Sequence, residues 1–338
     1  MEFLRRRIGI ILRTLVSVLL IAWLIRKIDW VKFWNIVRTA DVHWLIAAFI
    51  CFIPVLFICS WRWRMLLNVH GVRLRFWRVF ELNMIGQFFS AFLLGTTGGD
   101  VIKIFYVARA VPDRKAAVGF TVVVDRVIGM IALLLFGAAI AIPNIQLLIS
   151  RHDTKVYTVI FFLLALAGVS GSILACFGPA LLQHPAIRSL VKRLPMAHRG
   201  VSIFAAYEKT ARAVGINVIA LIGSIPSHMC IVLMGWCILQ ALGLHPALLT
   251  FGAIMAIVNM LIALPISIAG LGVREVLFVT FLGLIGIDPD YAAAFSLTYF
   301  TLNLGWSLVG GPFYFLYRHE THAPPPDVAQ VEPIFSKP

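Results

Sequence analysis

The sequence consists of long apolar runs, two of which are interrupted by glycine and charge. The interruptions are Leu94–Asp100 and Pro265–Glu275, and apolar sequence lies on both sides of each. Lipid cannot hydrogen-bond to bare backbone groups, so irregular backbone at membrane depth must be buried in protein or line a cavity. Interrupted segments at corresponding places in two halves are typical of a transporter's binding site.

Composition defines the class of protein. The chain is 61% hydrophobic and 13% charged, whereas soluble domains carry about 25% charged residues. We therefore expect an all-α polytopic integral membrane protein. The net charge of +14 comes from basic residues beside the apolar runs, where they meet lipid headgroups, so nucleic acid is not an expected partner. The five cysteines lack metal-ligand spacing, and we expect neither a metal site nor a cofactor.

The apolar runs predict about six full spans and two re-entrant broken-helix regions. The expected spans are residues 8–25, 44–60, 116–142, 156–177, 216–241 and 292–317. The broken regions are residues 79–110 and 248–286. Basic residues flank the first broken region on both sides, including Arg78 before it and Arg114 after it. The positive-inside rule then favours a segment that dips into the membrane and returns.

The same rule orients the whole chain. Arg5–Arg7 and Arg318 place both termini in the cytoplasm, so a location in the cytoplasmic (inner) membrane is expected. Residues 1–318 form one transmembrane domain, and residues 319–338 read as a disordered cytoplasmic tail. The order of span, span, dip and span occurs twice with opposite orientation, which predicts inverted repeats over 8–142 and 156–317.

The first interruption carries candidate binding residues. Gly98 and Gly99 precede Asp100, and Lys103 follows within one helical turn. Glycines before a helix start expose backbone N–H groups, which favours an anionic ligand. Alternatively, the glycines make a tight bend and Asp100 is the helix N-cap.

The second interruption repeats this chemistry. Gly270 and Gly272 bend the chain, and Arg274 and Glu275 open the next helix. Arginine binds phosphate through two parallel hydrogen bonds. The alternative is an ion pair between helices, and because adjacent residues diverge on a helix, Arg274 and Glu275 are expected to have separate partners.

Charged and polar residues inside the apolar runs supply further candidates. Asp125 and Arg126 lie well inside the 116–142 run, where charge is costly and marks either function or a structural tie to the opposite charge on a broken helix. Glu81, Asn83 and Gln87 could line a polar route or bond the irregular backbone.

Other polar residues read as structural. Trp61–Arg64 is typical of an interface anchor. His228 and Asn259 are lone polar residues in apolar runs, and we expect each to bond a neighbouring helix.

Together these motifs resemble the flippase-like membrane family that includes the transmembrane region of lysylphosphatidylglycerol synthases. The resemblance covers roughly residues 8–318 and rests on four motifs: Arg62–Arg64, Gly98–Asp100 with Lys103, Val124–Gly129, and Pro265 with Gly270–Glu275. The chain differs in carrying Asp125 where family members often have Glu.

The resemblance implies a lipid flippase or transporter that moves a phospholipid or lipid-linked phosphate between leaflets. The implied cargo is an anionic phospholipid or a polyprenyl- or hopanoid-type lipid, with a separate lipid-modifying enzyme as a further partner. Since no soluble catalytic domain is evident, transport is favoured over enzymatic activity. Two alternatives stay open: an intramembrane transferase acting on a lipid-linked donor, and a non-catalytic membrane partner of a lipid- or hopanoid-modifying pathway.

Overall fold

The described residues form helices joined by short turns and irregular connections, with no strands among them. The computed structural model describes residues 34–36, 38–92, 96–182, 197–263 and 272–317, without the side chains of 92–97 and 176–203. The helices are α3 (Val42–Cys51), α4 (Ile53–Val69), α5 (Phe76–Phe92), α6 (Thr96–Ala110), α7 (Lys115–Ala141), α8 (Ile145–Leu148), α9 (His152–Leu182), α11 (Ala197–Arg212), α12 (Val214–Ala241), α13 (Leu248–Ala263), α14 (Val273–Leu282) and α15 (Pro289–Leu316).

Four helical stretches among the described residues are long and apolar enough to cross a bilayer. They are Val42–Val69, Pro112–Leu148, His152–Ala175 and Val214–Ala241. The expected span 292–317 coincides with α15, which is helical but too polar to meet the same criterion. The expected span 8–25 and the tail 319–338 lie outside the described residues.

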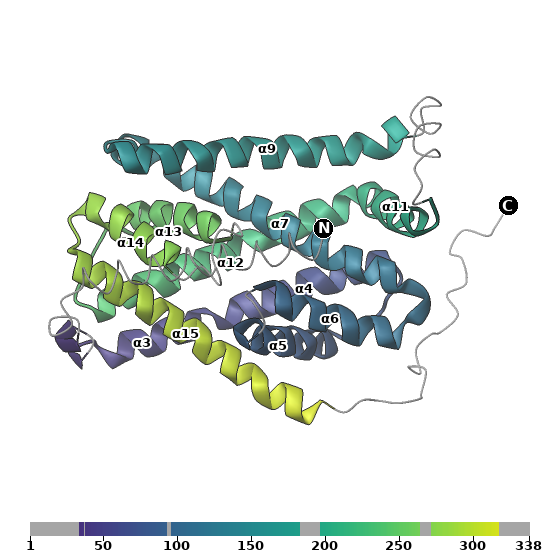
Figure 1. Ribbon diagram of the computed structural model, residues 1–338, viewed down its shortest axis with the longest axis horizontal. Helices are drawn as coiled ribbons and strands as arrows, with labels where there is room; N and C mark the ends of the chain where they lie inside the picture. Colours follow the sequence, from purple (N-terminus) through teal and green to yellow (C-terminus); the bar gives the residue numbers. More distant parts are fainter. Residues whose placement is uncertain (1–33, 37, 93–95, 183–196, 264–271, 318–338) are drawn as a thin grey trace, which may run out of the picture.

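The first interrupted region consists of two helices packed against each other. α5 and α6 lie side by side (Figure 1) and are joined through residues 93–95. α6 begins at Thr96, so Gly98 and Gly99 lie inside the helix. The alternative that made Asp100 the N-cap is therefore wrong, because a full helical turn precedes it.

In the second interrupted region, a helix begins where the sequence predicts one. α14 starts at Val273, directly after Gly272, whose φ of +82° suits glycine. The Gly272 backbone N–H donates to Glu275 Oε2 at 2.7 Å. Pro265 and Gly270 lie outside the described residues.

The helix that follows each of the pairs α5–α6 and α13–α14 in sequence also packs against the other pair. α7 follows the α5–α6 pair in sequence and packs against α13, while α15 follows the α13–α14 pair and packs against α5. Figure 1 shows the two pairs toward opposite ends of the long axis, with α7 and α15 crossing obliquely between them. The contacts therefore close a loop in the order α5, α6, α7, α13, α14, α15.

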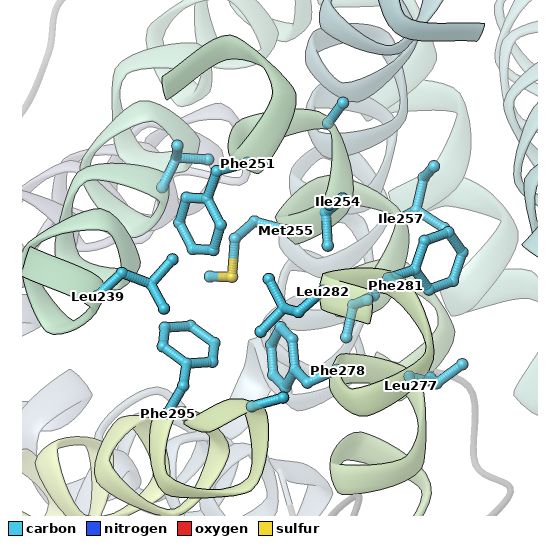
Figure 2. Close-up of a cluster of buried hydrophobic side chains, with 14 of the residues drawn as sticks. Leu239, Phe251, Ile254, Met255, Ile257, Leu277, Phe278, Phe281, Leu282 and Phe295 are labelled. Carbon is cyan, nitrogen blue, oxygen red and sulfur yellow. The ribbon is translucent and has the colours of Figure 1, made fainter. Parts of the chain in front are cut away.

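The main apolar core surrounds the α13–α14 pair. Figure 2 shows Phe251, Met255, Phe278 and Phe295 pointing toward one another from α13, α14 and α15. Phe278 and Phe295 meet edge to face with ring centroids 4.9 Å apart. Aromatic pairs of this geometry stabilise a core beyond simple burial, so α14 is held firmly beside α15.

Candidate functional site

The first charged cluster comprises Arg62, Asp100, Lys103, Asp125 and Arg126. At its centre Arg62 of α4 donates to both carboxylate oxygens of Asp125 on α7, at 2.6 Å and 3.1 Å. Arg62 is 6% exposed and Asp125 is 8% exposed. The remaining guanidinium nitrogen of Arg62 donates to Ser224 Oγ on α12 at 2.9 Å. This fork ties three helices together, as expected for a desolvated arginine–carboxylate pair.

A second carboxylate in this cluster has two cationic neighbours. Arg126 Nε donates to Asp100 Oδ2 at 2.7 Å. Lys103 Nζ lies 3.0 Å from Asp100 Oδ1, as an ion pair outside hydrogen-bonding geometry. The Lys103 and Asp100 side chains are each 12% exposed, whereas that of Arg126 is 46% exposed. Arg126 is therefore the accessible cation of the cluster.

Polar groups of α4 and α5 hold Lys103 in place. Its ammonium donates to Asn83 Oδ1 at 3.2 Å, and Asn83 donates to Ser60 Oγ at 2.9 Å. The ammonium also lies 5.1 Å from the centroid of the Trp63 ring, a cation–π distance. Asn83 thus links Lys103 of the first charged cluster to Ser60 on α4, and its lining of a polar route stays a prediction.

Close packing of α6 against α5 fixes the position of Asp100. A Cβ added to Gly99 would lie 2.0 Å from the Gly86 carbonyl oxygen, which no side chain can occupy. Only glycine lets α5 and α6 approach so closely. The role of Gly99 in this structure is packing, one residue before the carboxylate.

The second charged cluster comprises Arg274, Glu275 and Ser296. Arg274 Nε donates to Glu275 Oε1 at 3.0 Å and to Ser296 Oγ at 3.1 Å, and a second guanidinium nitrogen also contacts Glu275 Oε1. The guanidinium carbon lies 4.7 Å from the centroid of the Phe300 ring. Arg274 is 5% exposed, Glu275 2% and Ser296 0%. The group is enclosed by α14 and α15.

The expectation of separate partners for Arg274 and Glu275 is wrong. Glu275 folds back over the start of α14 to cap Gly272, and this brings its other oxygen beside the Arg274 side chain. The rule that adjacent residues diverge applies to side chains that extend outward from a helix. At the first turn, capping overrides it.

Two candidate residues of α5 lie apart from the charged clusters. Glu81 pairs with Arg78 at 3.2 Å on the same helix. Gln87 donates to Ser307 Oγ on α15 at 3.4 Å. Gln87 thus joins α5 to α15 and is a helix-to-helix contact.

The role of Arg62 was not predicted from the sequence. The stretch Trp61–Arg64 was expected to be an interface anchor, but Trp63 is 1% exposed and Arg62 is buried against Asp125. The apolar run was ended at residue 60, whereas α4 continues to Val69. An arginine directly after a long apolar run, with another span carrying Asp125, was the signal available.

His228 and Asn259 bond neighbouring helices, as predicted. His228 Nε2 lies 3.0 Å from the Gly129 carbonyl oxygen on α7, and Asn259 Oδ1 accepts from the Tyr299 hydroxyl on α15 at 3.4 Å. Among the described residues, no group of three or more His, Cys, Asp or Glu side chains could hold a metal ion.

His70, which directly follows α4, is buried and joins the end of α4 to α11. His70 Nε2 lies 2.9 Å from Thr210 Oγ1, and the His70 carbonyl accepts from Arg114 at 3.0 Å. Burial, and then the positive charge of Lys209, lower the pKa of the imidazole below its ordinary value of 6.5.

The comparison with known families decides the assignment. The family described as the lysylphosphatidylglycerol synthase TM region matches residues 10–310. The chain belongs to this family. Membership associates the protein with membrane lipids, and the apolar helices make it a membrane protein. No curated protein and no solved structure matched the chain.

Proposed function

We propose that the protein moves an anionic phospholipid or lipid-linked phosphate between the leaflets of the cytoplasmic membrane. The observation that carries this proposal is the charge balance of the first charged cluster. Its three cations face two carboxylates, which leaves one positive charge. A phosphodiester headgroup carries one negative charge, so the two are complementary.

Arg126 is the residue we propose to receive the headgroup. It is the most exposed cation of the cluster, and its Nε donates to Asp100 Oδ2. Its guanidinium is a fork that fits phosphate. Lys103 would supply the second positive charge from the α6 side, while the acyl or prenyl chain stays in lipid.

The second charged cluster is proposed as the opposite wall of the site, together with Gly270 and Gly272. Arg274 already engages Glu275 and Ser296, so it would reach a phosphate only after its side chain leaves Glu275. We also propose that residues 8–142 and 156–317 are inverted repeats with both termini cytoplasmic. The packing of α7 against α13 and of α15 against α5 supports this proposal, because each pair is contacted in the same way by the helix that follows the other.

The test is transport of a fluorescent phosphatidylglycerol by purified protein in vesicles. Wild type should move the lipid, and Arg126→Gln should slow transport at least about tenfold, as for loss of a charge-assisted hydrogen bond. Arg151→Gln is the matched control, because Arg151 makes an exposed 2.9 Å pair with Asp153 instead. Its rate should equal that of wild type.

Other outcomes identify the alternatives. A new lipid product formed from a lipid-linked donor would indicate an intramembrane transferase. Neither transport nor product, in protein that melts cooperatively, would favour a non-catalytic membrane partner. Equal transport by wild type and Arg126→Gln would remove Arg126 from the site.

A further inference from the structure

A cavity of about 120 Å³ lies where α7, α12 and α13 meet. Its lining consists of five apolar residues and two polar ones: Leu133, Phe136, His228, Ile231, Val232, Ala256 and Asn259. Five of these seven residues are partly exposed. The cavity is therefore partly open to the surface, and two of its helices, α7 and α12, belong to stretches long and apolar enough to cross a bilayer.

His228 presents a hydrogen-bond acceptor to this cavity. Its Nε2 lies 3.0 Å from the Gly129 carbonyl oxygen, and because a carbonyl only accepts, Nε2 must carry the hydrogen. In a neutral imidazole the other ring nitrogen, Nδ1, is then an acceptor. Within the described part of the chain, Nδ1 has no hydrogen-bond partner, and the ring only stacks on Phe136 at 6.4 Å.

Asn259 presents a donor. Its Oδ1 accepts from the Tyr299 hydroxyl at 3.4 Å, which directs the amide nitrogen away from Tyr299. Across the residues described, the Nδ2 hydrogens have no partner. An amide NH₂ in apolar surroundings gains free energy when it finds an acceptor.

We propose that this cavity binds the hydroxyl end of a neutral, largely apolar molecule that enters from the lipid. A hydroxyl donates one hydrogen and accepts others, so it satisfies His228 Nδ1 and Asn259 Nδ2 together. The apolar remainder of the lining suits an alkyl chain and disfavours a charged group. The volume holds about four water-sized groups, enough for a hydroxyl and the first carbons of its chain.

This site differs in chemistry from the phosphate site proposed above, and it lies between the two charged clusters. Gly129, which receives the His228 bond, packs beside the Arg62 guanidinium, since a Cβ there would lie 3.1 Å from an Arg62 nitrogen. Asn259 reaches α15 through Tyr299, one residue before Phe300, whose ring lies against Arg274 of the second charged cluster. A bound hydroxyl would bridge the residues that touch each cluster.

The experiment uses purified full-length protein and an octanol that carries a diazirine beside its hydroxyl end. After irradiation, the label should map to the α7, α12 and α13 residues that line the cavity. Excess 1-octanol should compete, and octane should compete at least about fivefold less well, as expected when one neutral hydrogen bond is lost. His228→Phe and Asn259→Leu should each lower labelling by about the same factor.

Asn217→Leu is the matched control, because Asn217 lies near the start of α12, where its side chain donates to the Thr210 carbonyl instead. It should label like wild type, and so should Arg126→Gln, which separates this site from the transport proposal. Equal competition by octane and 1-octanol would overturn the proposal and leave a merely apolar pocket. Labelling elsewhere in the chain would overturn it as well. The competition arm uses wild type alone, so it decides the matter even if a variant fails to fold.

Discussion

The two charged clusters contain the same kinds of residue in different surroundings. The first gathers its charges from α4, α6 and α7, keeps one positive charge in excess, and exposes Arg126. The second pairs Arg274 with Glu275 between α14 and α15, is neutral, and is closed to solvent. The difference teaches that an intramembrane charge can be accessible for binding or buried in an ion pair between helices, and the sequence alone does not distinguish the two cases.

The largest expected effect on stability is at the second charged cluster. Arg274→Ala leaves Glu275 buried without its cation, which should lower the free energy of unfolding by about 3–5 kcal/mol. Thermal melting in detergent measures this loss. The double variant Arg274→Met/Glu275→Gln removes both charges and should recover most of the stability. If the single variant melts like wild type, the second charged cluster is not a structural tie.

A smaller loss is expected at the centre of the first charged cluster. Asp125→Asn keeps one acceptor for Arg62 but leaves its charge uncompensated, which should cost roughly 2–3 kcal/mol. Asp153→Asn removes a carboxylate from an exposed pair and should cost less than about 1 kcal/mol. Unchanged melting with abolished transport in Asp125→Asn would instead assign Asp125 a direct role in transport.

The third prediction tests whether the packing of α5 against α6 positions the first charged cluster. Gly99→Ala places a methyl group against the Gly86 carbonyl, and the resulting shift of α6 should cost about 1–3 kcal/mol. Gly119→Ala on α7 meets nothing within 4 Å, so it should melt at or slightly above the wild-type temperature. If both variants melt alike, the close contact of α5 with α6 does not hold Asp100 in place.

The smallest expected effect is a pH dependence of the stability that arises from His70. Because the pKa of His70 lies below 6.5 in the folded protein, the unfolded chain binds a proton that the folded one resists. Stability should therefore fall as pH drops from about 6.5 toward the lowered pKa. His70→Gln should show a weaker decline between pH 7.5 and pH 5.5. An identical decline in both proteins would assign the effect to other groups.

Local patterns predicted the helices and most charged residues of both clusters. The start of α14 follows from Gly272, which adopts a positive φ, and from Glu275 at the capping position. Asp125 does pair with a cation, but its partner is Arg62 of α4, 63 positions earlier, and not a cation of a broken helix as the alternative reading has it. Nothing local to either residue encodes that distance. Spacing rules reach about one helical turn, and pairings between helices depend on packing.

The position of Asp100 in α6 was also predicted wrongly from the sequence, for a related reason. Glycine before Asp100 fits both a bend and a close helix contact, and the deciding atom is the Gly86 carbonyl on another helix. In the same way, the apolar run that ends at residue 60 hides the buried turns of α4 beyond it. An arginine can be buried when a carboxylate pairs with it, yet it scores as polar in any window of sequence.

The closed loop of contacts among α5, α6, α7, α13, α14 and α15 has a mechanical consequence. A loop has no free end, so force applied to one helix pair reaches the other through α7 and through α15, and the contacts from α5 through α4 and α12 to α13 add a third route. Moving the pairs directly apart would break all of these contacts at once. Motion that slides or rotates the pairs past each other keeps them. A passage for a headgroup would then open by shear between helices, with the two pairs moving in step.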